Sequence, residues 1–526
     1  MRTIVLSGFM ATGKTTVGQR LAVRLGLPFV DTDDAIARDA GRSVADLWRD
    51  EGEAAFRARE AEAIAPLLRD PAPKVIALGG GSVTNRALRH LALDRAFVVT
   101  LTAPPAVVVA RAGQLASRPN LAQGGDAGAR AAHLLEERAA AYAEAHLTLA
   151  TDAMDPDAVV EAIVAGAQRD PIGVALGRRT YQVDVVIGQP ARLTDALARL
   201  APSSLVVVTD SHVQRARSKA LDAALSSLAF PATRVTLPSG EAHKTIATVG
   251  TIWDAALGAG VDRDAVLVAF GGGVVGDLTG FAAATLLRGV RFVQVPTTLL
   301  AMVDAAVGGK TGFDHPAGKN LVGAFHQPSA VVADLEHLTT LPARERTAGL
   351  AEVVKIALAC DGELLAQLEA SADAVARGEP AALAPVVRRA IEDKAKIVRD
   401  DEHEAGARAL LNLGHTIGHA LEAHGGYARY LHGEAVAIGT VLELEAAWHL
   451  GLTSKEIVDR ARAITLRLGL PAHAAPAEVA ASWSFVGADK KRRGASIKLP
   501  VVGVIGAAEV RDVALGELRA AALAGV

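Results

Sequence analysis

Two apolar runs in this 526-residue chain each end in a glycine-rich turn, and these turns limit the folds that the sequence can adopt. The run Thr3–Ser7 leads into Gly8-Phe-Met-Ala-Thr-Gly13-Lys14-Thr15, and the run Val266–Phe270 leads into Gly271-Gly-Gly-Val-Val-Gly276-Asp277. A glycine-rich turn between a buried strand and a helix lets backbone N–H groups approach a phosphate, and the helix dipole favours that anion. The chain is therefore predicted to contain two parallel α/β units.

Apolar runs alternate with helical patterns along the first part of the chain, which is typical of a doubly wound α/β domain. Predicted strands are Thr3–Ser7, Val75–Leu78 and Phe97–Leu101, and predicted helices are Lys14–Leu25, Gly52–Leu68, Arg130–Ala145 and a segment from Pro156 to about Ala167 that Asp155 caps. The pattern breaks at Arg169-Asp-Pro-Ile-Gly173, where we place a domain boundary.

Strand character returns after that break, and helical patterns dominate from about Leu338 onward. The later predicted strands are Val183–Ile187, Val206–Thr209, Val266–Phe270 and Phe292–Val295. We expect three structural units: an α/β unit at residues 1–170, a Rossmann-like α/β unit at 171–336, and a mainly α-helical unit at 337–526.

Composition narrows the classes of protein to which the chain can belong. The formal net charge of −3 implies no general affinity for nucleic acid or an anionic membrane. The single cysteine, Cys360, excludes an intrachain disulfide and a zinc site built mainly on thiolates. The window Ala265–Leu287 is apolar enough to resemble a membrane span, but Asp277 and three consecutive glycines favour a strand and a phosphate loop. The start of the chain lacks the pattern of a signal peptide, so we expect a cytoplasmic protein.

The first glycine-rich turn has the flanking strand and helix that a nucleoside triphosphate loop requires. Lys14 is predicted to neutralise the β/γ-phosphate charge, and the Thr15 hydroxyl is predicted to ligate Mg²⁺. The full set predicted to bind ATP is Gly8, Thr12, Gly13, Lys14, Thr15 and Thr16.

Two carboxylates, Asp31 and Asp33, follow the next apolar segment. Strand alternation predicts that both carboxylates lie on one side of the strand. There one would assist Mg²⁺, and the other would accept a hydrogen bond or a proton from the hydroxyl of the phosphoryl acceptor. The alternative is that both acids only cap helices. Further along the chain lie Arg57 with Glu60, Gly79-Gly80-Gly81 after a strand, Arg118 in a loop of lid-like composition, and Arg138 with Tyr142.

The order of these motifs over about residues 1–168 resembles shikimate kinase. The resemblance implies that shikimate is held by Asp33, Arg57, Gly80, Gly81 and Arg138, that Asp31 assists the metal, and that Arg118 closes over the phosphates. It also implies catalytic roles for Lys14, Asp33 and Arg118. Two arginines are suitable partners for the carboxylate of such a substrate.

The second glycine-rich turn contains G-x-G-x-x-G and suits a dinucleotide pyrophosphate. A plain Rossmann dehydrogenase would carry an acidic residue about twenty positions later, where this chain has Gln294. Three cationic side chains and one amide then follow in a glycine-rich stretch, which predicts a binding site for an anionic small molecule. They are Arg288, Lys310, Lys319 and Asn320. The alternative is a solvent-exposed basic face.

One carboxylate and two histidines, with an open fourth position, form a pattern typical of catalytic zinc, and this part of the chain offers one such carboxylate and three histidines. Glu352 lies on a predicted helix, His415 and His419 are four residues apart on one helical face, and His432 follows. The spacing alone favours His415 and His419 as ligands.

The segments from Gly271 to Pro328, Leu350 to Lys355 and Asn412 to Glu434 resemble 3-dehydroquinate synthase, and the likeness covers about residues 175–526. It implies zinc or cobalt on Glu352, His415 and His432, with His419 at the substrate. It implies NAD⁺ at Asp210, Glu241, Lys244, Gly272, Gly273, Asp277, Thr297 and Thr298, with Lys310 and Lys319 close to both ligands. It implies substrate contacts from Arg288, Asp304, Lys310, Lys319, Asn320, Lys394, Arg408, Asn412 and a lysine of Lys490-Lys491, and it gives Arg288, Lys310 and His419 catalytic roles.

The same resemblance implies the reaction. The substrate would be 3-deoxy-D-arabino-heptulosonate 7-phosphate and the product 3-dehydroquinate. The conversion proceeds by a reversible oxidation with NAD⁺, loss of phosphate and an intramolecular aldol closure. NAD⁺ is regenerated, and the cations bind the departing phosphate. The family resemblance also implies a homodimer through this half.

Three rival hypotheses remain open at this level. The second half could be a metal-dependent polyol dehydrogenase, which would not need Arg288, Lys310, Lys319 and Asn320 together, or another sugar-phosphate cyclase. The first half could be an ATP-sensing module, although such a module need not keep acceptor-binding groups.

Overall fold

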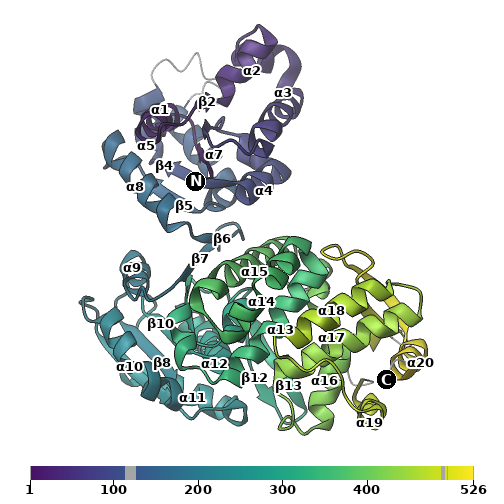
Figure 1. The fold of residues 1–526 in the computed structure, drawn as a ribbon. Coiled ribbons are helices and arrows are strands. Elements are labelled where there is room, and N and C mark those ends of the chain that lie inside the picture. Colours follow the sequence, from purple (N-terminus) through teal and green to yellow (C-terminus); the bar gives the residue numbers. More distant parts are fainter. Residues whose placement is uncertain (1, 113–125, 487–491, 494–495, 525–526) are drawn as a thin grey trace. The chain divides into compact units, whose positions relative to one another are not determined.

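The protein, seen here as a computed structural model, is described over residues 2–112, 126–486, 492–493 and 496–524 (Figure 1). It divides into two compact units, Met1–Gln182 and Val183–Val526. The domain limits expected at residues 170 and 336 stay predictions. Each unit is described by itself below.

The first unit is built on a five-stranded sheet in the order β2-β3-β1-β4-β5. All four pairings between its strands are parallel. The strands are β1 (Thr3–Gly8), β2 (Phe29–Asp31), β3 (Val75–Ala77), β4 (Ala96–Thr102) and β5 (Leu147–Ala150). The predicted doubly wound α/β fold is therefore confirmed for this unit.

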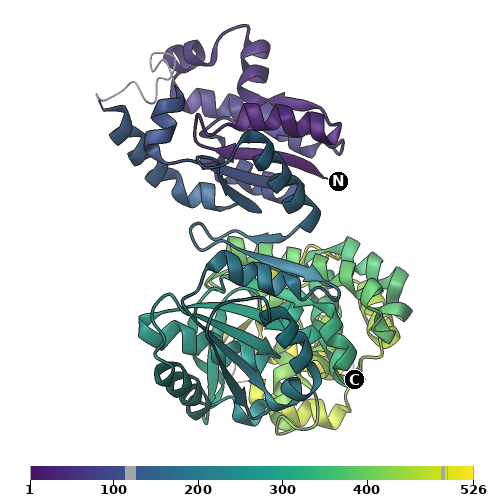
Figure 2. The same cartoon turned by 90° about the vertical axis from the view of Figure 1, so that its left-hand side faces the viewer.

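Helices cover both faces of this sheet, because its central strands are apolar on both sides (Figure 2). On one face α1 and α8 pack against Ile4 and Leu6, and on the other α3, α4 and α7 pack against Val5 and Ile76. The helices are α1 (Lys14–Leu25), α2 (Thr32–Ala40), α3 (Val44–Arg69), η1 (Ser82–Thr84), α4 (Arg86–Arg95), α5 (Pro105–Ala112), α7 (Ala127–Ala143) and α8 (Pro156–Arg169). Asp155 caps α8 as predicted, accepting from Asp157 N and Ala158 N.

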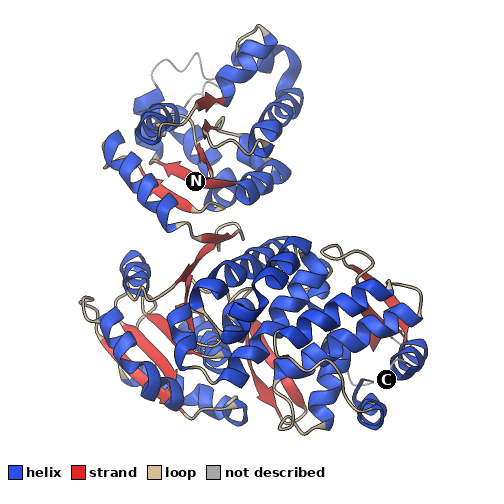
Figure 3. Cartoon of the chain, viewed as in Figure 1, coloured by secondary structure: helices blue, strands red, loops and turns tan. Residues whose placement is uncertain are grey.

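The second unit contains most of a seven-stranded sheet in the order β6-β7-β14-β11-β10-β8-β9 (Figure 3). Its strands are β6 (Ile172–Val174), β7 (Tyr181–Val186), β8 (Leu205–Asp210), β9 (Ala232–Leu237), β10 (Val266–Gly271), β11 (Arg291–Pro296) and β14 (Ala330–Asp334). The segments between them include α9 (Ala191–Leu200), α10 (Ser211–Leu225), η3 (Glu241–His243), α11 (Ile246–Gly258), α12 (Gly273–Thr285), η4 (Leu286–Arg288) and η5 (Ala301–Ala305), and η6 (Leu335–Thr340) follows β14. The four pairings from β14 to the edge strand β9 are parallel.

An antiparallel hairpin of β12 (Lys310–His315) and β13 (Gly318–Phe325) interrupts this alternation. The sequence predicts only a polar ligand-binding segment in this stretch, so the two strands were not expected. A Cβ on Gly312 would lie 2.4 Å from Val322 O, and one on Gly323 would lie 2.1 Å from Thr311 O. The paired strands therefore need glycine at both positions.

The last part of the chain is mainly helical, as predicted, and comprises α13 (Ala343–Cys360), α14 (Gly362–Arg377), α15 (Pro380–Asp400), η7 (Ala407–Asn412), α16 (His415–His424), α17 (His432–His449), α18 (Lys455–Arg467), α19 (Pro476–Val486) and α20 (Leu515–Ala524). It also contains a small antiparallel sheet, which the sequence analysis did not predict. Its strands are β15 (Arg492–Arg493), β16 (Ser496–Val501) and β17 (Glu509–Ala514).

The apolar window Ala265–Leu287 divides between β10 and α12, so the strand-and-loop interpretation is confirmed. Across the described residues, no helix combines the length and the apolar character that a membrane crossing requires.

Candidate active sites

The first candidate site begins where β1 turns into α1. Lys14 Nζ lies 2.9 Å from both Gly8 O and Phe9 O, so its ammonium group is held at the centre of the loop. Thr12 donates to Phe9 O over 2.8 Å. The loop backbone is thereby closed around a cation at a helix N-terminus, which is an arrangement that favours an anion.

The two residues predicted to assist Mg²⁺ lie together, since Thr15 Oγ1 is 2.8 Å from Asp31 Oδ2. Asp31 ends β2 and also caps α2 by accepting from Asp33 N over 3.1 Å. Asp33 lies within α2, so the prediction that strand alternation places both carboxylates on one side was wrong. A hydroxyl and a carboxylate oxygen at this separation are a suitable ligand pair for a hard cation.

Asp33 faces a second carboxylate across the loop that follows β3. A Cβ on Gly79 would lie 2.7 Å from Asp33 Oδ1 and 2.6 Å from Glu60 Oε1, so both acids border this glycine. Burial, and then the negative charges of Glu60 and Asp31, raise the pKa of Asp33 to about 6. Asp33 can therefore both accept and release a proton near neutral pH.

Two arginines border the same glycine loop. Arg57 pairs with the buried Glu60 over 2.7 Å, and a Cβ on Gly81 would lie 2.0 Å from Arg57 Nη2. Arg138 donates to Gly80 O over 3.2 Å. The structure thus gathers Asp33, Arg57, Gly80, Gly81 and Arg138, which are the residues predicted for shikimate, around one loop.

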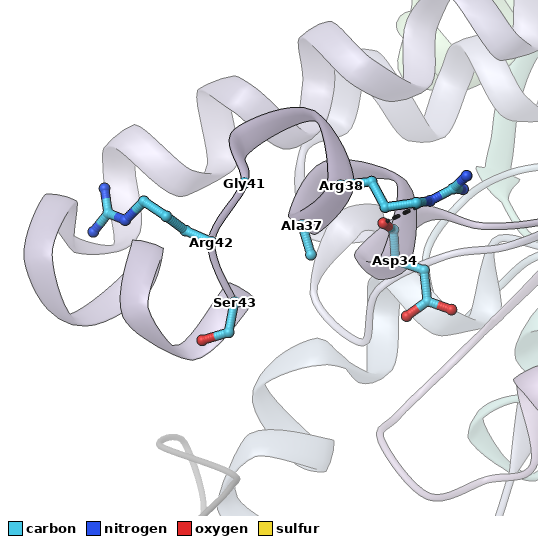
Figure 4. A pocket seen from close by; sticks show the side chains of 6 residues that line it. All are labelled: Asp34, Ala37, Arg38, Gly41, Arg42 and Ser43. Atoms are coloured by element: carbon cyan, nitrogen blue, oxygen red, sulfur yellow. Dashed lines mark hydrogen bonds between the residues drawn. The ribbon is translucent and has the colours of Figure 1, made fainter.

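Arg118, the predicted lid residue, lies outside the described residues. An open cavity of about 460 Å³ borders α2 near Arg38 and Arg42 (Figure 4). Its lining holds none of the residues predicted for ATP or shikimate, and Arg42 is already paired with Asp50 and Glu51. We therefore give this cavity no role in the candidate site.

The second candidate site begins at the carboxyl ends of the parallel strands in the second unit, where α/β sheets hold nucleotides. Asp210 ends β8 and caps α10, accepting from His212 N over 2.8 Å. Gly272 precedes α12, and a Cβ there would lie 3.1 Å from Thr298 Cγ2. Thr297 N donates to Gly271 O over 2.9 Å, which joins the ends of β10 and β11. Asp210, Gly272, Thr297 and Thr298 all belong to the set predicted for NAD⁺.

A buried lysine joins the nucleotide end of this site to the hairpin. Lys244 Nζ lies 2.7 Å from Asp277 Oδ2 and 2.6 Å from Asn320 Oδ1. Burial raises the pKa of Asp277 to about 6, although Lys244 opposes that rise. Lys319, beside Asn320, lies 3.7 Å from Glu241 Oε1. Residues predicted for NAD⁺ and for substrate thus form one connected polar network.

Other predicted substrate residues meet where the hairpin and η5 face the helical part. Lys394 on α15 pairs with Asp304, and Lys310 lies 2.5 Å from Glu404 Oε2. Asn412 Nδ2 donates to the other oxygen of Glu404 over 3.4 Å. Arg408 donates to Gly308 O over 3.2 Å.

Burial lowers the pKa of Lys394 to about 8, although Asp304 opposes the fall. Burial would raise the pKa of Asp304, but Lys394 and Lys355 together outweigh it and hold that pKa far below its usual range.

One predicted residue, Arg288, is not brought into this network by any described contact, and another lies outside the described residues. Arg288 is exposed at the end of η4 with φ of 67°, and no described contact joins it to the other site residues. The Lys490-Lys491 pair lies outside the described residues.

Close helix packing assembles the acidic and histidine residues. A Cβ on Gly433, beside His432, would lie 1.8 Å from Ala348 O on α13, one turn before Glu352. A Cβ on Gly439 of α17 would lie 2.1 Å from Gly414 O, next to His415. Glycine at these positions lets α17 touch both neighbouring helices, so Glu352, His415 and His432 converge.

The convergent groups have the geometry of a cation site. Glu352 Oε1 lies 3.6 Å from His415 Nε2 and 3.6 Å from His432 Nε2. His419 joins them, and one ligand atom from each of the three histidines lies within 4.8 Å of the others. Glu352 is 0% exposed, and its Oε1 has no hydrogen-bond partner among the described residues. A buried carboxylate oxygen without a partner costs free energy that a bound cation would offset.

The outer nitrogens of two histidines fix the direction of their inner lone pairs. His415 Nδ1 is 3.1 Å from Leu413 O, and His432 Nδ1 is 3.0 Å from Glu422 Oε2. Both partners can only accept, so both Nδ1 atoms carry hydrogen and the Nε2 atoms are left to bind a cation.

Charges around the cluster also suit a cation. Burial would lower the pKa of His432, but the neighbouring carboxylates Glu352 and Glu422 outweigh it and raise that pKa to about 10. Burial would raise the pKa of Glu352, but Lys355 and His432 together outweigh it and hold that pKa below its usual value. The residues therefore fit a divalent metal such as Zn²⁺ or Co²⁺.

Comparisons with known proteins identify the family of this part of the chain. The family models of the 3-dehydroquinate synthase N-terminal and C-terminal domains match residues 234–348 and 349–492. The chain is 46% identical over 350 residues to a 3-dehydroquinate synthase from Acidithiobacillus ferrooxidans, and the match covers 66% of this chain and 95% of that protein. The chain belongs to the 3-dehydroquinate synthase family.

The first unit adds a second activity to that synthase, because the shikimate kinase family model matches residues 10–168. The chain is therefore a shikimate kinase fused to a 3-dehydroquinate synthase, which makes it a bifunctional enzyme of the shikimate pathway. The resemblances found in the sequence are confirmed.

Two solved structures share the synthase fold. ValA (2-epi-5-epi-valiolone synthase) from Streptomyces hygroscopicus, with NAD⁺ and Zn²⁺ bound, is 32% identical with a TM-score of 0.59, over 65% of this chain and 96% of ValA. A 2-deoxy-scyllo-inosose synthase, complexed with carbaglucose-6-phosphate, NAD⁺ and Co²⁺, is 23% identical with a TM-score of 0.60, over 68% of this chain and all of that one. The second likeness shows the fold alone.

The synthase and kinase sites also contain buried acids to which the sequence analysis gave no role. Glu60 holds Arg57, Glu422 holds His432, and Glu443 accepts from Gly414 N over 2.8 Å and from Ile417 N over 3.0 Å at the start of α16. The signal in the sequence was only a charged residue inside an otherwise apolar helix, which Glu443 in Val-Leu-Glu-Leu-Glu illustrates.

Proposed function

We propose that the first site transfers the γ-phosphoryl group of ATP to the 3-hydroxyl of shikimate. The observation that carries this is the grouping of Lys14, the Thr15–Asp31 pair and the arginine-bordered loop of Gly80 and Gly81 in one unit. Lys14 and the loop N–H groups bind the phosphates, and Mg²⁺ held by Thr15 and Asp31 supplies further positive charge there. Arg57 and Arg138 bind the shikimate carboxylate, and Asp33 accepts the proton of the attacking hydroxyl.

Substitution of Lys14 tests this assignment. Lys14→Ala removes the cation at the centre of the loop, so kcat for shikimate phosphorylation should fall by about 10²–10³-fold. Unchanged turnover in that variant would remove the basis for this site.

We propose that the second site converts 3-deoxy-D-arabino-heptulosonate 7-phosphate to 3-dehydroquinate and phosphate. The observation that carries this is the unpartnered Glu352 Oε1 between His415 Nε2 and His432 Nε2, beside a network of cations. Bound NAD⁺ supplies a reversible hydride acceptor, and a bound Zn²⁺ or Co²⁺ acidifies a substrate hydroxyl.

The residues of this chain have distinct proposed tasks. Asp210, Glu241, Lys244, Asp277 and the Gly272–Thr298 turn orient the nucleotide at the carboxyl ends of the strands. Lys310, Lys319, Asn320, Lys394 and Arg408 bind the anionic substrate and stabilise the departing phosphate. His419 contacts the substrate from the cluster of histidines. Asn412 and the exposed Arg288 complete the substrate-binding residues that the family resemblance implies.

Turnover of NAD⁺ separates this proposal from the dehydrogenase alternative. Phosphate release should exceed the NAD⁺ supplied, with no net NADH, and a chelator should stop it until metal is returned. NADH formed in proportion to product would favour the polyol dehydrogenase instead. The cyclase alternative is not favoured, because the identity to a dehydroquinate synthase, 46%, exceeds the 32% to ValA.

Two further features of the protein remain part of this proposal. We expect a homodimer through the synthase half and a cytoplasmic location, where both pathway substrates are small soluble metabolites. Sedimentation of the full chain tests the first expectation, and fractionation of cells tests the second.

A further inference from the structure

Glu422 occupies a position that links two parts of the synthase site. The residue lies on α16, seven residues after His415, and is 4% exposed. Its Oε2 is 3.0 Å from His432 Nδ1, and its Oε1 is 3.7 Å from Lys319 Nζ on the hairpin. One buried carboxylate thus contacts both a proposed metal ligand and a proposed phosphate-binding cation.

The contact with His432 decides which ring nitrogen carries hydrogen. A carboxylate oxygen only accepts hydrogen bonds, so Nδ1 must donate, and Nε2, which faces Glu352 Oε1, is the nitrogen that can offer its lone pair to a metal. His415 is fixed differently, by the backbone oxygen of Leu413, which no side-chain substitution removes. Glu422 is therefore the side chain whose chemistry sets the orientation of the His432 ring.

Lys319 stabilises the negative charge that this role requires. Its ammonium group lies between Glu422 and Glu241, 3.7 Å from each, and 4.3 Å from the centre of the Tyr427 ring. Because Glu422 is buried, its charge would be costly without such partners.

We propose that Glu422 is a positioning residue, which sets the tautomer of His432 and so determines how tightly the synthase site binds its metal. The inference rests on the proposed metal site of Glu352, His415 and His432. A neutral amide at position 422 can donate to Nδ1 as well as accept from it, so it permits the tautomer in which Nε2 carries hydrogen and cannot bind metal.

The test is titration of the metal-free full-length protein with Co²⁺ alone, followed by calorimetry and by the visible absorption of the bound ion. Four proteins are compared: wild type, Glu422→Gln, Glu445→Gln and His415→Ala. Glu445 is the matched control because it also lies on the α16–α17 pair, is buried and is ion-paired, in this case with Arg462.

Wild type and Glu445→Gln should bind one Co²⁺ with the same affinity and spectrum. Glu422→Gln should bind 10- to 100-fold more weakly, with a changed spectrum, which loss of packing far from the metal would not produce. Equal affinity and an unchanged spectrum in Glu422→Gln would overturn the positioning role.

Two controls separate the possible failures. If His415→Ala binds Co²⁺ as wild type does, the proposed metal site itself is wrong, whatever Glu422→Gln shows. If Glu422→Gln does not melt cooperatively without metal, Glu422→Asp replaces it: the shorter carboxylate should weaken binding and change the spectrum, and wild-type binding there would overturn the inference.

Discussion

A methyl group added at Gly81 should disable the kinase without unfolding it. A Cβ at this position would lie 2.0 Å from Arg57 Nη2 and 2.4 Å from its Cζ, whereas ordinary contacts begin at 3.4 Å. The guanidinium group must therefore withdraw by roughly 1 Å or more, and a displacement of that size at a substrate-positioning group can cost about 100-fold. Gly81 has φ of −115°, so alanine imposes no backbone strain.

The magnitude follows from the bond that is lost. A hydrogen bond to a charged group contributes about 1.5–3 kcal/mol, so Gly81→Ala should lower kcat/KM for shikimate by roughly 10- to 100-fold. KM for ATP should stay unchanged, because the three atoms nearest to a Cβ on Gly81 all belong to Arg57 and none to Lys14 or the phosphate loop. A coupled assay of ADP release, run over a range of each substrate, measures both values.

A double-mutant cycle decides whether Arg57 carries the effect. In an Arg57→Ala background, Gly81→Ala should cost nothing further, because the displaced group is already absent. Gly128→Ala is the control for alanine itself, since among the described residues its Cβ would meet only Asp126 Oδ1, at 3.3 Å. If Gly81→Ala costs the same with and without Arg57, or costs nothing in wild type, the reasoning is refuted.

Two further predictions concern pH and the division of the chain. Lys394 is protonated below about pH 8 and loses its charge above it, so kcat/KM of the synthase should fall as pH rises through 8; Lys394→Arg, whose charge persists, should lose this limb of the profile. A kinase fragment of residues 1–182 should have a melting temperature about 4–8 °C above that of a fragment of residues 1–170. The longer fragment keeps two hydrogen bonds, from Gly177 N to Glu144 (2.9 Å) and from Gln182 to His146 O, and each contributes about 1 kcal/mol to the free energy of unfolding. Equal pH profiles for the synthase variants, or equal melting temperatures for the fragments in differential scanning calorimetry, would contradict the respective prediction.

The parallel sheets could be predicted from the sequence because their strands are buried on both faces and read as continuous apolar runs. Val266–Phe270 and Thr3–Ser7 lie inside β10 and β1, and Lys14–Leu25 has the observed limits of α1. In each case local periodicity and tertiary burial agree.

The hairpin of β12 and β13 could not be predicted in this way. Its residues Leu321, Val322 and Phe325 are exposed, so the strand lacks alternation between buried and exposed positions. Pairing there depends on Gly312 and Gly323, and glycine lowers the strand propensity of an isolated segment. The predicted strand position of Asp33 was also wrong, because the strand ends at Asp31, which caps the helix that contains Asp33.

The spacing of residues along the sequence predicts only part of the candidate metal site. Two histidines four apart on a helix identify His415 and His419, but His432 and Glu352 reach them through packing between helices that are distant in sequence. The buried acids that orient these ligands carry no motif. Glu422 resembles any helical glutamate until the structure places His432 and Lys319 on either side of it.

The most direct test of the account is a pair of assays on the full chain with one site removed at a time. Lys14→Ala should lose shikimate phosphorylation and keep wild-type release of phosphate from 3-deoxy-D-arabino-heptulosonate 7-phosphate. His415→Ala should lose that release, and its bound metal, and keep wild-type shikimate kinase activity. Each site draws its proposed residues from one unit, so neither activity should depend on the other. Loss of both activities in either variant, with the fold intact by circular dichroism, would contradict the account of two independent active sites in one chain.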